Sequence, residues 1–182
     1  MLGLKRGTVA LSEHQNSWHG DAARAIGLLK GVLSDAAIDI QHVGSTAIVG
    51  IHAKPIIDIA VGVTSLNAVM PHIPSLEKHG IIYRKQDVEG QMLFVMGDFE
   101  KNIRTHHIHV VLWNSTPWQD YVNFRAYLNA FPEKARSYDD LKCSLAVKFA
   151  QDRGSYTQAK QELIAKLLAE AAFWRKNISL NP

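Results

Sequence analysis

Residues 42–63 constrain the fold of this chain more than any other stretch. The sequence passes through a Gly44-Ser45 turn and a short loop into an apolar strand at 55–63 that carries one acid, Asp58. Gly44 and Ser45 can bring backbone N–H groups and a hydroxyl close to an anion. A carboxylate in an apolar strand costs desolvation free energy unless a cation, a metal or hydrogen-bond donors pair with it. The stretch therefore predicts a phosphate and metal site.

Hydrophobic periodicity divides the chain into a sheet-forming part and a helical part. We expect strands at 36–43, 55–63, 80–86, 91–97 and 103–112, and a short strand or extended arm at 7–13. We expect helices at 17–33, 65–79 (short or kinked at its prolines), 116–130 with Thr116 as its cap, 133–150 and 155–174. Short connections favour an antiparallel meander for the last three strands.

Strands first and helices last predict an α+β fold, with a mixed β-sheet, N-terminal helices and a C-terminal helical layer. We predict one domain over residues 1–182, with a sheet-containing core in 1–113 and a helical part in 114–182. A chain of 182 residues with 47% hydrophobic and 20% charged residues is long enough and apolar enough for one substantial core.

Charge and cysteine content limit the partners and the compartment. A net charge of +3 without a Lys/Arg run is compatible with a phosphate-bearing small molecule and does not favour a nucleic acid. One cysteine, Cys143, excludes an intramolecular disulfide, so we expect a reducing cytoplasm. We see neither a signal peptide nor a run of the roughly 18–20 apolar residues that span a membrane, so we expect no membrane partner.

Two histidines on a later strand are the second candidate feature. Asp58 shares a strand face with the small residues Ala60 and Gly62, which leaves room for a ligand. His107 and His109 share a face of the 103–112 strand, and two such imidazoles with a carboxylate can bind one divalent metal, Mg²⁺, Mn²⁺ or Zn²⁺. They can equally act in proton transfer, or be histidines that neighbouring groups satisfy.

Lys54 and Arg104 are candidate partners for an anion. Lys54 lies in the loop between the Gly44-Ser45 turn and Asp58, and arginine binds phosphate in a bidentate manner. Arg104 shares the strand face of His106, opposite to His107. Ordinary salt bridges are the alternative for both cations.

Other residues have a structural interpretation. The tyrosine–lysine pairs at 138/142 and 156/160 are interpreted as helix packing, with the mouth of a cleft as the alternative. Trp113 and Trp118 are predicted core residues, and Cys143 a small buried apolar residue.

Residues 42–47 (HVGSTA), Gly50 and residues 53–59 (AKPIIDI) resemble the signature of the GrpB family. Residues 104–110 (RTHHIHV) resemble the second block of that family, and segments of the C-terminal helices resemble its helical tail. Val49 departs from the proline that is usual at its position.

The resemblance implies a nucleotidyltransferase-like fold, in which the glycine-serine turn holds a triphosphate. Active members of that superfamily bind two Mg²⁺ ions with an acid pair on the next strand and a third acid on a later strand. This chain keeps Asp58, has Ala60 in place of the second acid and carries histidines where the third acid is sought. The expected function is binding of a nucleotide or another phosphate-bearing ligand, with metal-assisted nucleotidyl transfer as its enzymatic form. The alternative is a non-catalytic ligand-binding or regulatory module.

Overall fold

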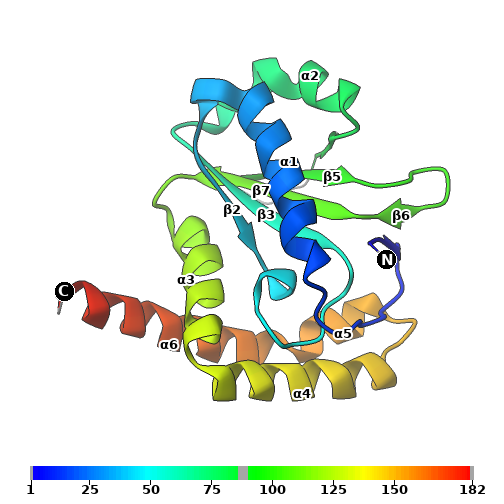
Figure 1. Cartoon of the computed structure of the whole chain (residues 1–182), viewed down its shortest axis with the longest axis vertical. Coiled ribbons are helices and arrows are strands. Elements are labelled where there is room, and N and C mark those ends of the chain that lie inside the picture. The colour runs from blue at the N-terminus through cyan, green and yellow to red at the C-terminus, as the bar shows by residue number, and fades with distance from the viewer. Residues whose placement is uncertain (1, 86–89, 181–182) are drawn as a thin grey trace.

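The computed structural model describes residues 2–85 and 90–180, whose arrangement Figure 1 shows. Five strands form one mixed sheet in the order β2-β3-β7-β5-β4. Their bounds are Ala37–Val43 for β2, Ile57–Val63 for β3, Ile82–Arg84 for β4, Gln91–Met96 for β5 and His106–Leu112 for β7. Strands β3 and β7 are parallel, and the other neighbouring pairs are antiparallel. The predicted α+β fold is confirmed, as is the antiparallel meander of β4, β5 and β7.

Helix α1 (Ser17–Leu33) covers one face of the sheet (Figure 1) and has the bounds that the periodicity predicts. Successive side chains of a strand point to opposite faces. The apolar face of β3 therefore packs in the same core cluster as α1, through Ile57, Ile59, Val61 and Val63. Burial of each large apolar side chain contributes roughly 1.5–3 kcal/mol. A slip of β3 by one residue would turn Asp58 into this core, so the face that carries the acid is fixed.

The other face of β3 packs against the C-terminal helices. A Cβ atom on Gly62 would lie 2.6 Å from Cε3 of Trp113 and 3.0 Å from Cζ3 of Trp118, so the glycine makes room for both rings. Trp118 is buried and Trp113 partly buried, in agreement with their predicted core role.

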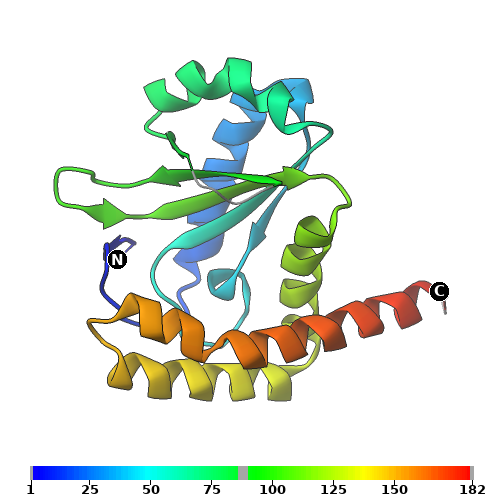
Figure 2. The same cartoon turned by 180° about the vertical axis from the view of Figure 1, so that it is seen from behind.

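Four helices follow β7, and they gather at the end of the molecule opposite to α2 (Figures 1 and 2). Their bounds are Thr116–Ala130 for α3, Pro132–Lys148 for α4, Arg153–Ala159 for α5 and Gln161–Leu180 for α6. The predicted helix at 155–174 is thus two helices that separate at Lys160. The hydroxyl of Ser115, and not that of Thr116, accepts the hydrogen bond that caps α3.

The N-terminal arm differs from the prediction. Strand β1 (Leu4–Lys5) pairs with β6 (Ile103–Arg104), whereas the 7–13 segment contributes a bridge between Ser12 and Ala53. A short strand at 7–13 was the wrong alternative, and the segment is an extended arm. The predicted 103–112 strand is interrupted at Thr105, so that β6 and β7 belong to different sheets.

The segment after β3 is helical but irregular, as its prolines predict. It forms the 3-10 helix η3 (Leu66–His72) and then α2 (Ile73–Lys78). The hydroxyl of Ser65 accepts a hydrogen bond from the N–H of Asn67 at its start. Residue 86 of the predicted 80–86 strand lies outside the described residues. Over residues 2–85 and 90–180, no helix combines the length and apolar composition that crossing a bilayer requires.

Candidate functional site

The Gly44 turn lies directly against the acid of β3. Strand β2 ends at Val43, whose partner across the ladder is Asp58. Gly44 has φ 70° and ψ −171°, a backbone region that is essentially restricted to glycine. A Cβ atom at this position would lie 2.5 Å from Oδ2 of Asp58. Both the backbone and the neighbouring carboxylate therefore require glycine here, and the turn and the acid form one unit.

Asp58, His107 and His109 meet on the face of the sheet that points away from α1. The parallel register places Asp58 beside His107, and Ala60 beside His109. One carboxylate oxygen, Oδ1 of Asp58, lies 3.4 Å from Nδ1 of His107 and 3.7 Å from Nε2 of His109. Burial alone would raise the pKa of Asp58, but the two imidazoles outweigh that effect and hold its pKa below the usual range. The carboxylate is therefore ionised and already has two polar partners.

A cavity of about 230 Å³ opens at Asp58, and its wall is strongly cationic. Asp58 is the one carboxylate among the described residues that line it. Seven basic side chains from the N-terminal arm, the 54 loop, β6, α4 and α5 line it as well: Lys5, Arg6, Lys54, Arg104, Lys142, Arg153 and Lys160. Ser45 and His107 also face this cavity, whereas Gly44 and His109 are not among its lining residues.

Most of these cations have no carboxylate partner in the part of the chain that the structure describes. Of the seven, Lys142 alone forms an ion pair there, with Asp139. Lys54 and Lys160 lie over the ring of Tyr156, at 4.5 and 5.1 Å from its centroid. Burial, followed by the charges of Lys160 and Arg153, lowers the pKa of Lys54 to about 8. Like charges gathered in this way repel one another, so an anionic ligand would stabilise the wall.

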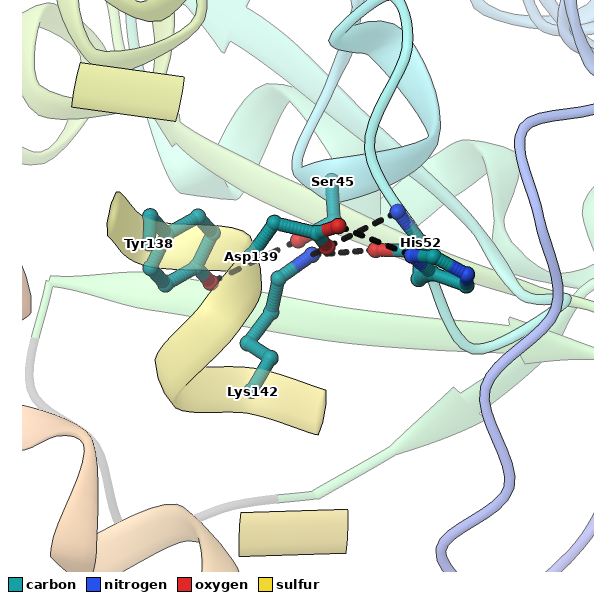
Figure 3. A network of polar contacts seen from close by, with 5 residues as sticks. All are labelled: Ser45, His52, Tyr138, Asp139 and Lys142. Atoms are coloured by element: carbon teal, nitrogen blue, oxygen red, sulfur yellow. Dashed lines mark hydrogen bonds and ion pairs between the residues drawn. The ribbon is translucent and has the colours of Figure 1, made fainter. Parts of the chain in front are cut away.

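A polar network holds the loop between β2 and β3, which carries His52, against α4 (Figure 3). Nζ of the fully buried Lys142 donates a hydrogen bond to the carbonyl of His52 and lies 3.3 Å from Oδ1 of Asp139. The Asp139 carboxylate accepts the N–H of His52 at 2.8 Å. The hydroxyls of Ser45 and Tyr138 are 3.4 Å apart. Burial lowers the pKa of Lys142 to about 8, and the carboxylate of Asp139 opposes that effect.

The structure changes the interpretation of several side chains. Arg104 lines the cavity together with His107, and does not share the side of His106, because the chain breaks its strand geometry at Thr105. The tyrosine–lysine pairs that we interpreted as helix packing contribute Lys142, Tyr156 and Lys160 to the cavity wall.

Arg153, Lys5 and Arg6 also line the cavity, and no pattern in the sequence had marked them as site residues. Cys143 is partly exposed, so its interpretation as a buried apolar residue is wrong.

The donor set does not fit a two-magnesium centre. Ala60 occupies the position of the second acid, and it is fully buried with Val43, Val111 and Trp118 under helix α3. A carboxylate there would have no opening toward the cavity. Strand β7 supplies imidazoles where a third acid would stand, and Mg²⁺ prefers oxygen ligands. One oxygen donor with two imidazoles has the chemistry for a single ion such as Zn²⁺. The ligand atoms of Asp58, His107 and His109 do not all lie within 4.8 Å of one another, so these side chains would have to move together to hold one ion.

The mixed sheet, the glycine turn and the acid-bearing strand define a nucleotidyltransferase-like fold. A structure of the Cid1 poly(U) polymerase with MgGTP bound has a TM-score of 0.52 to this chain at 11% identity, and the match covers 75% of this chain and 44% of that one. This likeness concerns the fold alone. The chain belongs to the GrpB family, because the family model described as GrpB protein matches residues 8–170.

Relatives in sequence and structure agree with this assignment. The glutamate-rich protein GrpB of Alkalihalophilus pseudofirmus is 38% identical over 173 residues, covering 93% of this chain and 99% of that protein. The UPF0157 protein YqkA of Bacillus subtilis is 34% identical over 149 residues, but the match spans 43% of its length. The crystal structure of the conserved protein GrpB from Enterococcus faecalis has a TM-score of 0.83 at 28% identity, covering 91% of this chain and 99% of that one.

Proposed function

We propose that this protein binds a ligand with several phosphate groups, a nucleotide or a related polyphosphate, in the cationic cavity. One observation carries the proposal: seven lysine and arginine side chains line the cavity with one carboxylate, and that carboxylate is already paired with two histidines. Several phosphates would neutralise several of these charges at once. Hydrogen bonds between ionised partners are also roughly twice as strong as neutral ones.

The proposed roles follow from position. Ser45 and the start of the 3-10 helix η2 (Ser45–Ala47) offer a hydroxyl and N–H groups to one phosphate, while Lys54 and Arg104 neutralise its charge. At about 230 Å³ the cavity is smaller than the roughly 300–1,000 Å³ of a typical small-molecule site. We therefore propose that only the phosphate chain enters the cavity, and that the rest of the ligand extends past its opening.

Asp58, His107 and His109 are the proposed chemical group of the site. One divalent ion held by these three side chains would polarise a phosphoryl oxygen. Without an ion, Asp58 orients His107 for proton transfer to or from the ligand. A Zn²⁺ ion matches the imidazole donors better than Mg²⁺ or Mn²⁺ does.

Ligand binding without chemistry is the second candidate function, and buried Ala60 favours it over two-metal nucleotidyl transfer. Active nucleotidyltransferases place a carboxylate at that position, and here a methyl group packs under Trp118 instead. A binding or regulatory module would keep the cationic wall and would not need the second acid.

Thermal unfolding of the full chain with a panel of nucleotides and pyrophosphate tests the proposal. Each ligand is added in chelator and then with Mg²⁺, Mn²⁺ or Zn²⁺, to the native protein and to Asp58→Asn. The proposal predicts stabilisation by polyphosphates in chelator and, if an ion takes part, an additional metal-dependent increase that Asp58→Asn abolishes. If no compound of the panel stabilises the native protein under any of these conditions, the proposal is wrong.

A further inference from the structure

Three potential metal ligands lie together beside Lys142. One ligand atom from each of His52, Asp139 and Cys143 lies within 4.8 Å of the other two. Asp139 and Cys143 are one turn apart on α4, so their side chains share a face of that helix. His52 comes from the loop that leads to β3. Within residues 2–85 and 90–180, no other group of histidine, cysteine and acidic side chains meets this criterion.

The backbone around His52 is fixed before any ion binds. Its N–H donates to Oδ1 of Asp139 at 2.8 Å, and its carbonyl accepts from Lys142. The next residue, Ala53, exchanges backbone hydrogen bonds with Ser12. Figure 3 shows the imidazole of His52 beside the carboxylate of Asp139. The loop and the helix therefore hold their donors in a constant relation.

The two carboxylate oxygens of Asp139 contact different partners. Oδ1 takes the N–H of His52 and lies 3.3 Å from Nζ of Lys142, whereas Oδ2 faces Nδ1 of His52 at 2.8 Å. An ion that binds Oδ2 leaves the partners of Oδ1 in place. Lys142 and the backbone N–H then orient the ligating carboxylate, as outer-shell groups do in metal sites.

We propose that Nδ1 of His52, a carboxylate oxygen of Asp139 and the thiolate sulfur of Cys143 bind one divalent transition ion of the Zn²⁺ class, with water as the fourth ligand. Nitrogen and sulfur donors select such ions over Mg²⁺ and Ca²⁺. Zinc bonds of about 2.0–2.3 Å place tetrahedral donors roughly 3.4 Å apart, so the His52–Asp139 contact must open by about half an ångström. The imidazole can make this movement because 41% of the His52 side chain is exposed.

Both protons and charge balance when the ion binds. The Cys143 thiol releases its proton to solvent. The proton that Nδ1 of His52 donates to Oδ2 of Asp139 moves through solvent to Nε2, so neutral His52 binds the ion through Nδ1 with no net release, and one proton leaves for each ion that binds. Two anionic donors then neutralise the two charges of the ion.

This site is separate from the proposed phosphate function, because none of its three ligands lines the cationic cavity. Lys142 stands between the two sites. Either site can therefore exist without the other.

Cobalt titration of the full chain, stripped of metals with a chelator, tests the proposal. We expect one Co²⁺ per chain, with the near-ultraviolet charge-transfer band of a cobalt–thiolate bond, and displacement of the cobalt by Zn²⁺. The ion should also protect Cys143, the single cysteine of the chain, from a thiol reagent. Absence of that band in the native protein overturns the proposal.

Matched variants assign the ligands. Cys143→Ser and His52→Ala should each weaken Co²⁺ binding at least tenfold, and the serine variant should lose the charge-transfer band. Asp140→Asn and His79→Ala, which alter exposed residues outside the group, should bind Co²⁺ as the native protein does. Unchanged binding in Cys143→Ser also overturns the proposal. Circular dichroism confirms that each variant is folded, and pyrophosphate stabilisation, measured in parallel, reports on the other site.

Discussion

Replacement of Gly44 by alanine tests whether the turn and the acid of β3 form one unit. The added Cβ would lie 2.5 Å from Oδ2, 2.9 Å from Cβ and 3.0 Å from Cγ of Asp58. The backbone conformation of Gly44 costs an alanine about 1–3 kcal/mol. Overpacking against Asp58 adds about 1–3 kcal/mol. We therefore expect Gly44→Ala to lower the free energy of unfolding by about 2–6 kcal/mol.

Gly50 provides the matched control. It has φ 77°, and a Cβ atom there would meet nothing within 4 Å. Gly50→Ala should therefore cost about 1–2 kcal/mol, the cost of a left-handed conformation alone. Urea unfolding followed by circular dichroism measures both variants, and for a chain of this length each kcal/mol corresponds to a fall of about 2–4 °C in Tm.

A double-mutant cycle with Asp58→Ala isolates the contact itself. Truncation of Asp58 removes its carboxyl group but keeps its Cβ, so part of the overpacking should disappear and Gly44→Ala should cost about 1–2 kcal/mol less in that background. Two results would show that the Gly44 turn and Asp58 do not form a packed unit. One is that Gly44→Ala costs no more stability than Gly50→Ala, and the other is that its cost is the same with and without the Asp58 carboxyl group.

Two further perturbations act on charge. Burial, followed by the charge of His19, lowers the pKa of His42 from 6.5 to about 4. The unfolded chain therefore binds a proton that the folded chain does not between these values, and about 1–3 kcal/mol of stability should be lost as the pH falls from 6.5 through 4. His42→Asn should reduce this loss of stability at low pH, as measured by urea unfolding. If the variant has the same pH dependence of stability as the native protein, His42 is not the group responsible. Lys160→Gln should raise the stability of the ligand-free protein by about 0.5–1 kcal/mol, because it relieves repulsion in the cavity wall, and should reduce stabilisation by pyrophosphate. Lys166→Gln, an exposed change outside the cavity, should alter neither quantity.

Periodic segments could be predicted from the sequence because their pattern is local. Helix α1 has an uninterrupted apolar stripe, and β3 alternates between apolar and small residues, so both the helix bounds and the strand face of Asp58 were predictable. Two-residue strands such as Leu4–Lys5 carry no periodic signal, and they form because a partner strand is present. The break at Lys160 has neither proline nor glycine to mark it.

The candidate site was only partly predictable, for a physical reason. Asp58, His107 and His109 could be grouped because two strands of a sheet bring such residues together. The cationic wall joins the N-terminal arm to α5, segments that lie nearly 150 residues apart in the sequence, and a lysine on a helix looks the same whether it faces water or a cavity. The residues that form this wall could therefore be identified only from the three-dimensional structure.

The cavity is proposed to bind a chain of phosphates through its lysine and arginine side chains. Calorimetric titration of the native protein with inorganic phosphate, pyrophosphate and triphosphate, in chelator and at two salt concentrations, tests it most directly. We expect the affinity to rise with each added phosphate, to fall at the higher salt concentration and to be lost when Arg153 and Lys160 are both replaced by alanine. Affinity that is absent, or that does not change with the number of phosphates, would contradict it.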